Sequence, residues 1–141
     1  SLDCDERVTP ELAEEIRKVA ESTDDKNVVY AIPIKTFIGK RWIKGAGYYP
    51  ASKARFFLKG QFKYEEARVH PRVIYQGTCG FFKGDILHYS CENLEQWIGK
   101  FNRETTLEAD KWIQDGRKVS MANSLRKTFD RFFKNYFLRL E

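Results

Sequence analysis

The sequence predicts an α/β domain in which a mixed sheet is followed by two C-terminal helices. The main observation is the order of hydrophobic patterns: one helical pattern, several β-rich runs, then two more helical patterns. Composition supports a packed core, because 42% of the 141 residues are hydrophobic and 15% are aromatic. The sequence has no run of about 18 uncharged apolar residues, so a membrane-spanning helix is excluded. The length fits one domain rather than two.

The first helix is predicted to begin at Thr9, because threonine caps helices and Pro10 suits the first helical position. Its apolar residues share one face: Leu12, Ile16, Val19 and Ala20. Strands are predicted at 28–36, 54–58, 67–75 and 81–89. We expect Pro33 to mark an edge or a bend in the first strand and a glycine turn at 77–80 to separate the last two.

The segment 39–50 contains three glycines and several aromatic side chains. It is too glycine-rich for a strand and too apolar for an ordinary surface loop, so we expect it to cover another part of the protein. A long helix is predicted from about Ser90 to Gly116, because apolar residues recur there at spacings of three and four. A second helix is predicted from about Met121 to Leu140.

Cysteines and charge narrow the functional classes. The three cysteines, Cys4, Cys79 and Cys91, form no Cys-x-x-Cys pair, which argues against a disulfide framework and indicates reduced thiols. Residues 1–25 carry nine acids and three bases, whereas residues 117–139 carry seven bases and one acid. We expect the basic C-terminus either to meet phosphate, on lipid or nucleic acid, or to be a solvated helix face without a partner.

Two kinds of side chain suggest chemistry. Asp3 and Asp5 are carboxylates one residue apart at the predicted end of a strand, and such a pair can hold Mg²⁺ or Mn²⁺ on a diphosphate. The alternative is a solvated acidic turn. His70 and His88 lie in apolar strand contexts, either as core or edge residues or as further ligands of a carboxylate-bound metal. The sequence lacks the motifs of serine hydrolases and of the common nucleotide-binding folds.

The last predicted helix has a broad apolar arc flanked by bases. The arc contains Phe129, Phe132, Phe133, Tyr136, Phe137 and Leu140, and the bases are Arg126, Lys127, Arg131, Lys134 and Arg139. This pattern fits a helix lying in an anionic membrane surface, and the alternative is a helix packed on the sheet. We expect a mixture, in which one edge of the arc packs on the protein and the other, with its bases, faces lipid.

Several short segments occur in an order that is typical of one known family. Residues 2–12, Leu-Asp-Cys-Asp-Glu-Arg-Val-Thr-Pro-Glu-Leu, resemble Leu-Asp-Ala-Asp-Glu-Arg-Val-x-Pro-Glu-Leu, a segment of bacterial family 2 glycosyltransferases, particularly those of the lipopolysaccharide core. Further landmarks follow in the family's order: residues 47–50 resemble Gly-Trp-Tyr-Pro, 53–57 Lys-x-Arg-Leu-Phe, 69–70 the start of Val-His-Glu, 87–90 Leu-His-Tyr-Ser, 100–103 Lys-x-Asn-Arg-Tyr, and 132–138 Phe-x-x-Tyr-Phe-Leu. The ordered set is more specific than any one segment.

The resemblance implies the C-terminal part of a GT-A fold, the α/β sandwich of nucleotide-diphospho-sugar transferases. Residues 1–141 would then be a single domain that is a fragment lacking the N-terminal nucleotide-binding half, with the GT-A part at 1–116 and a basic amphipathic helix at 117–141. We expect the isolated fragment to be inactive. We also expect it to self-associate, because its first strand would be cut and a sheet edge exposed.

The resemblance also assigns roles to residues. Asp3 and Asp5 match the metal–diphosphate motif, and Arg55 matches a basic position on the acceptor or phosphate side. His88 corresponds either to a third metal contact or to a hydrogen-bond donor to the phosphate. The chain has Pro71 where many relatives have the glutamate of His-Glu. Because an inverting transferase needs a base for the acceptor hydroxyl, the candidates here are Glu65, Glu66 and His70.

The resemblance predicts a glycosyltransferase that moves a sugar from a nucleotide-sugar donor to a lipid-linked or glycan acceptor in cell-envelope polysaccharide assembly, with inversion. It implies Mn²⁺ or Mg²⁺ as cofactor and a cytoplasmic location, peripheral on the inner face of the cell membrane and bound through the C-terminal helix. Nucleic acid is not expected as a partner of such an enzyme. Two alternatives stay open: a non-catalytic module that binds anionic lipid or nucleic acid, and an inactive relative of the transferases.

Overall fold

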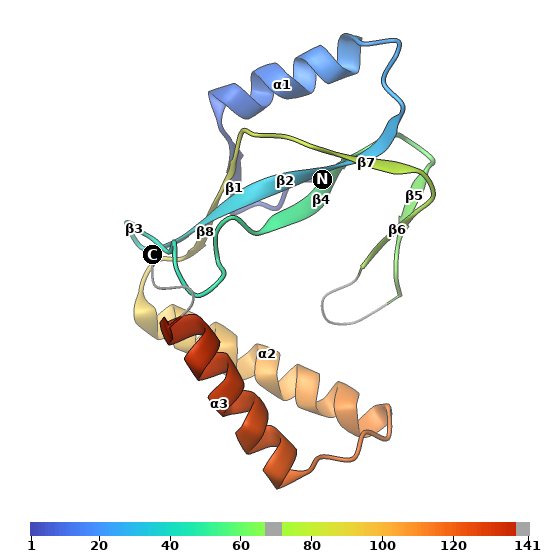
Figure 1. Ribbon diagram of the computed structural model, residues 1–141. Helices are drawn as coiled ribbons and strands as arrows, with labels where there is room; N and C mark the ends of the chain where they lie inside the picture. The colour runs from blue at the N-terminus through green and yellow to red at the C-terminus, as the bar shows by residue number, and fades with distance from the viewer. Residues whose placement is uncertain (67–71, 138–141) are drawn as a thin grey trace.

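A computed structural model describes residues 1–66 and 72–137. Within these residues the chain forms eight strands and three helices (Figure 1). The strands are β1 (Glu6–Val8), β2 (Asn27–Ile38), β3 (Arg41–Trp42), β4 (Ser52–Phe57), β5 (Phe62–Tyr64), β6 (Val73–Tyr75), β7 (Thr78–Phe81) and β8 (Ile86–Cys91). The helices are α1 (Pro10–Glu21), α2 (Leu94–Gln114) and α3 (Met121–Phe137). The predicted class, a mixed sheet followed by two C-terminal helices, is confirmed.

The main sheet is organised around β2, its longest strand. The first half of β2 is flanked by β7, which runs parallel to it, and by β4, which runs antiparallel. The second half, from Ile34, is flanked by parallel β8 and antiparallel β3. Pro33, which has no N–H to donate, lies between the two halves. Pro33, which was expected to mark an edge or a bend, therefore lies where the partner strands of β2 change.

Strand β1 places the acidic N-terminal turn beside β8. The two strands are antiparallel, with Glu6 opposite His88 and Val8 opposite Ile86. Thr9 caps α1 as predicted, because its Oγ1 accepts a hydrogen bond from the Leu12 N–H at 3.3 Å. A separate antiparallel pair, β5 and β6, forms a hairpin beside the sheet (Figure 1).

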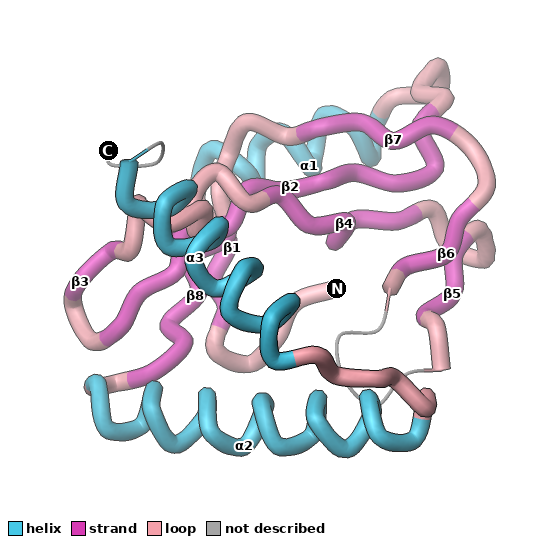
Figure 2. The backbone as a smooth tube through the Cα atoms, turned by 60° about the horizontal axis from the view of Figure 1, so that its bottom comes forward, coloured by secondary structure: helices cyan, strands magenta, loops and turns pink. Residues whose placement is uncertain are grey.

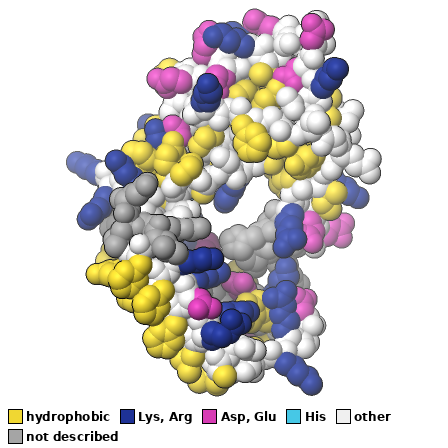
Figure 3. Space-filling model, viewed as in Figure 1, with side chains coloured by type: hydrophobic (Ala, Val, Ile, Leu, Met, Phe, Trp, Pro, Cys, Tyr) yellow, Lys and Arg dark blue, Asp and Glu magenta, His cyan; other side chains and the backbone are white. Residues whose placement is uncertain are grey.

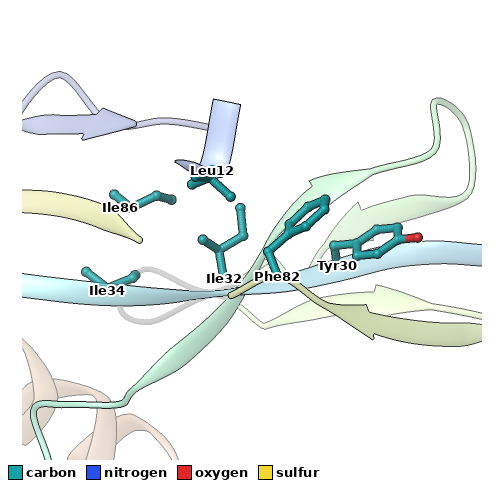
Figure 4. Packing of buried hydrophobic residues seen from close by; sticks show 6 residues of the cluster. All are labelled: Leu12, Tyr30, Ile32, Ile34, Phe82 and Ile86. Atoms are coloured by element: carbon teal, nitrogen blue, oxygen red, sulfur yellow. The ribbon is translucent and has the colours of Figure 1, made fainter. Parts of the chain in front are cut away.

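The core lies between α1 and the sheet (Figure 4). Its buried side chains are Leu12, Tyr30, Ile32, Ile34, Phe82 and Ile86, and Leu12 is completely inaccessible to solvent. Ile16 and Val19 pack against this cluster as the helical pattern predicted, whereas Ala20 is exposed. Burying a leucine side chain completely is worth about 2–3 kcal/mol, so Leu12 anchors α1 on the sheet.

Helices α2 and α3 lie on the other side of the sheet from α1 (Figures 1 and 2). No residue of either helix is buried in the part of the chain that the structure describes. Five aromatic residues of α3 are each more than half exposed: Phe129, Phe132, Phe133, Tyr136 and Phe137. A row of hydrophobic side chains follows the lower left edge of Figure 3, where α3 runs.

This exposure decides between the arrangements considered for α3. Packing on the sheet as an ordinary helix is wrong for residues 121–137, and so is the expected mixture with one edge of the arc against the protein. Arg139 and Leu140, which belong to the predicted arc and its flanks, lie outside the described residues. The apolar face of α3 is therefore open to solvent.

The predicted turn at 77–80 is correct only at Gly77, which has a φ of 129° and lies between β6 and β7; residues 78–80 belong to β7. Gly80 is needed for packing, since a Cβ there would lie 2.4 Å from the Tyr30 ring. The predicted strand 81–89 is interrupted at 82–85, where a Cβ on Gly84 would lie 2.4 Å from the Leu12 backbone nitrogen. Both glycines therefore allow close approach, and one of them falls at a break that the apolar pattern concealed.

Two further boundaries differ from the prediction. Ser90 belongs to β8, and α2 begins at Leu94, where the Asn93 side chain caps the helix by accepting a hydrogen bond from the Gln96 N–H at 2.9 Å. The apolar pattern of this stretch fits the end of a strand as well as the start of a helix. Of the strand predicted at 67–75, β6 covers 73–75, and residues 67–71 lie outside the described residues.

Candidate functional site

A cleft of about 590 Å³ lies between the sheet and α2. Figure 3 shows the molecule hollowed between its upper and lower parts. The turn before β1 and strands β2, β4 and β8 supply most of the polar lining: Asp3, Asp5, Glu6, Thr36, Lys53, Arg55, His88 and Ser90. Ala46, Gly47 and Tyr48 of the glycine-rich segment also line the cleft. The expectation that this segment is too glycine-rich for a strand is wrong at Arg41–Trp42, which form β3.

Asp5 and His88 form one polar pair in this cleft. The His88 Nε2 lies 3.2 Å from the Asp5 Oδ2, and both side chains are partly exposed. The pairing of β1 with β8 creates this contact, because it places Glu6 opposite His88 and lets the Tyr89 N–H donate to the Asp5 carbonyl at 2.9 Å. A carboxylate and an imidazole predicted from separate segments are therefore neighbours.

Arg55 connects the acidic turn to β4. Its Nη2 donates to the Asp3 Oδ2 at 2.7 Å and to the Glu6 Oε1 at 2.8 Å. The Arg55 guanidinium, by this hydrogen bond, holds the pKa of Asp3 below its usual range. Glu6 is only 6% exposed, so Arg55 supplies the charge that a buried carboxylate requires. The acidic turn is therefore fixed to the sheet rather than freely solvated.

Helix α2 forms a second wall that sequence reasoning missed. Trp97, Lys100, Phe101 and Glu104 line the cleft and recur at the spacing of one helical face. The Trp97 and Phe101 rings stack at 5.6 Å between centroids, and the Lys100 Nζ donates to the Ser90 Oγ at 3.4 Å. The signal in the sequence was two charged residues on an otherwise apolar face.

Of the three candidates for a catalytic base, the structure describes Glu65 and Glu66. His70 lies outside the described residues. Glu65 and Glu66 follow β5 and are exposed, and neither is among the residues that line this cleft. The Glu65 N–H donates to the Arg72 carbonyl at 2.8 Å, which fixes the backbone of the β5–β6 hairpin. Glu104 is the carboxylate that α2 adds to the cleft.

The metal expected from the sequence needs oxygen or nitrogen ligands that are free to coordinate. Among residues 1–66 and 72–137, no three histidine, cysteine or acidic side chains are placed to hold one ion together. Asp5 and His88 are close enough to share an ion, whereas one oxygen of Asp3 is already held by Arg55. The protein therefore offers a two-residue set, which fits a cation that takes its other ligands from a bound diphosphate.

No family model matches the chain. No solved structure matches it either. In the described part of the chain, no helix combines the length and the apolarity that crossing a bilayer requires.

Proposed function

We propose that this protein is a glycosyltransferase of the nucleotide-sugar-dependent type, built on part of a GT-A fold. The observation that carries the proposal is the meeting of Asp3, Asp5, Arg55 and His88 in one cleft. These residues come from three segments that resemble the transferase family, and they adjoin one another in space. The meeting supports a common site, because nothing in local sequence requires these segments to converge.

The proposed reaction transfers a sugar with inversion. An acceptor hydroxyl attacks the anomeric carbon, the bond from that carbon to the diphosphate oxygen breaks, and the nucleoside diphosphate leaves with the electron pair. Lys100 lines the same cleft and is suited to stabilise negative charge on the leaving diphosphate. The hydroxyl proton passes to a base, for which Glu104 joins Glu65, Glu66 and His70 as a candidate.

A divalent cation, Mn²⁺ or Mg²⁺, fits the donor set described above. Asp5 and His88 would hold it, with Asp3 assisting when it is released by Arg55. When bound, the cation would neutralise charge on the diphosphate. The contribution of the chain's own residues is to orient that diphosphate, since Asp5 is fixed by β8 and Asp3 by β4 through Arg55.

The proposed acceptor is a lipid-linked sugar or glycan, and the exposed helix α3 supports a membrane surface as partner. The apolar face of α3 is exposed, and four bases flank it: Arg126, Lys127, Arg131 and Lys134. Apolar burial in the interface and attraction to anionic lipid would act together on this helix. The same observation favours the second candidate, a module that binds anionic lipid without catalysis.

Calorimetry on the natural chain that contains these residues tests the donor site. With a nucleotide sugar and Mn²⁺, we expect Asp5→Asn to lose the metal-dependent binding, because the substitution removes a charged ligand. Asp110→Asn is the matched control, since Asp110 is exposed on α2 and does not line the cleft. Unchanged metal-dependent affinity in Asp5→Asn would overturn the proposal.

A further inference from the structure

A second cavity, of about 650 Å³, adjoins the cleft and has no role in the function proposed above. The two share Asp3, Lys53 and Arg55, so the salt bridge between Asp3 and Arg55 forms part of the partition between them. The remaining walls come mainly from β4 and the β5–β6 hairpin, and they include Tyr64, Arg72 and Tyr75.

The charged side chains that line this cavity differ in whether they form ion pairs. Arg55 is committed to Asp3 and Glu6 through its Nη2. Lys53 and Arg72 form no ion pair with any residue in 1–66 or 72–137. Arg55 carries a single charge and faces two carboxylates, Asp3 and Glu6. Among the described side chains, three cations (Lys53, Arg55 and Arg72) and one carboxylate (Asp3) line the cavity, so positive charge is in excess there.

We propose that this cavity binds the phosphate monoester of a phosphorylated sugar, held by Lys53 and Arg72. A phosphate monoester carries about −1.5 to −2 charges at pH 7, which matches two cations, and its oxygens accept the parallel hydrogen bonds that a guanidinium donates. Tyr64 and Tyr75 also line the cavity, and aromatic faces pack against the apolar face of a sugar ring.

The position of the cavity gives the ligand a role. A sugar phosphate there would lie beside the proposed donor cleft, across the boundary that Asp3, Lys53 and Arg55 form. Its identification as the acceptor rests on the proposed glycosyl transfer, whereas the phosphate binding does not. The acceptor class would then be a sugar that already carries a phosphate group.

Titration calorimetry of the full chain with a hexose 6-phosphate tests the site. We expect Arg72→Gln to weaken binding about tenfold or more, because a charge-assisted hydrogen bond is lost. The backbone of Arg72 keeps its hydrogen bond to Glu65, so the hairpin is retained. Lys63→Gln is the matched control: it removes the same charge from the same hairpin, and Lys63 lines neither cavity.

Two further arms separate the sources of the phosphate. If the ligand is a soluble sugar phosphate, vesicles containing phosphatidic acid bind wild type and Arg72→Gln equally while hexose 6-phosphate discriminates between them. If the phosphate belongs to a lipid head group, the vesicles discriminate as well. Equal binding of both probes by wild type and Arg72→Gln overturns the proposal.

The donor site is tested separately, so that the two proposals can fail independently. Asp5→Asn is expected to leave hexose 6-phosphate binding unchanged, because Asp5 lines the first cleft and not the second. If wild type bound hexose 6-phosphate but no nucleotide sugar, the proposed phosphate site would be supported and the proposed glycosyl transfer would be contradicted. A sugar lacking phosphate that bound as tightly as hexose 6-phosphate would overturn the role of the two cations.

Discussion

Helix α1 buries its apolar face against the sheet, whereas α3, which is longer and richer in aromatic residues, leaves its apolar face exposed. Leu12 of α1 is 0% exposed, and Phe133 of α3 is 55% exposed. Both helices have an apolar face and a charged face, so their sequences make the same demand for a covering partner. The difference teaches that amphipathicity predicts the need for a partner without identifying it.

The sheet contains the features that receive α1. Gly84 leaves room for the Leu12 backbone, and the Glu15 carboxylate accepts hydrogen bonds from the Lys83 and Gly84 N–H groups at 2.8 and 3.3 Å. Gly99, on α2, has no atom within 4 Å of an added Cβ. The close approach that Gly84 allows beside α1 therefore has no counterpart at Gly99 of α2.

The largest expected effect concerns the binding of α3 to membranes. Replacing Arg126, Lys127, Arg131 and Lys134 by Gln should weaken binding to anionic vesicles roughly a thousandfold, because each base near the surface contributes about 1 kcal/mol. Vesicle sedimentation at low and high salt measures this, and wild-type binding should weaken with salt. The control with the same charge change replaces Lys26, Lys40, Lys59 and Lys63 by Gln. Salt-insensitive binding, or none, would show that α3 meets a different partner.

The next effect compares the two helices directly. Leu12→Ala should lower the free energy of unfolding by about 3 kcal/mol, because it leaves a cavity in the core. Phe133→Ala should change it by about 0.5 kcal/mol or less, since exposed side chains contribute little to folding. Urea unfolding of both variants gives the two values. A loss in Phe133→Ala as large as that in Leu12→Ala would mean that α3 is covered in solution.

Two glycine substitutions sharpen the comparison. Gly84→Ala should destabilise the protein by about 1–3 kcal/mol, because the new methyl would meet the Leu12 backbone nitrogen at 2.4 Å. Gly99→Ala should instead stabilise α2 by about 0.5–1 kcal/mol, since alanine costs less backbone entropy in a helix and has open space there. Thermal unfolding followed by circular dichroism distinguishes the signs. Equal effects of the two changes would contradict the assigned packing.

The smallest expected effect is a pH dependence of the free energy of unfolding, which arises at Asp85 and its two partners, Tyr49 and Lys35. Burial, with a hydrogen bond to Asp85, raises the pKa of Tyr49 above its ordinary value of 10.0. The phenol therefore contributes stability that is present below pH 10.0 and lost as the pH rises through the folded-state pKa. The ion pair with Asp85 at 2.7 Å likewise raises the pKa of Lys35, so the stability that Lys35 contributes is also lost at high pH.

Tyr49→Phe tests this dependence. The variant should lose about 1 kcal/mol at neutral pH with the hydrogen bond to Asp85, and its stability should fall less steeply than that of wild type above about pH 10. Urea unfolding at pH 8 and pH 11 measures both quantities. Tyr136→Phe, on exposed α3, serves as the control and should keep the wild-type pH dependence. A wild-type slope in Tyr49→Phe would contradict the assignment.

The sequence correctly predicted those features of the fold that depend on residues close together in the chain. Thr9 and Pro10 specified the start of α1, Gly116 followed the end of α2 with a φ of 64°, and the spacing of Leu12, Ile16 and Val19 gave the buried face. These features depend on capping, backbone freedom and helical periodicity, which act over a few residues. The same local rules extended the turn at Gly77 as far as Gly80, because a glycine required for packing has the same sequence signature as a glycine in a turn.

The candidate site was determined partly by sequence and partly by tertiary structure. The sequence nominated Asp3, Asp5, Arg55 and His88 individually, through the resemblance and their residue types. Only the fold decided that Arg55 meets a carboxylate 49 positions away, that the face of α2 around Lys100 forms a cleft wall, and that α3 stays uncovered. The physical reason is that these outcomes depend on strand pairing and burial between distant segments, and the energy of such contacts is absent from any local pattern.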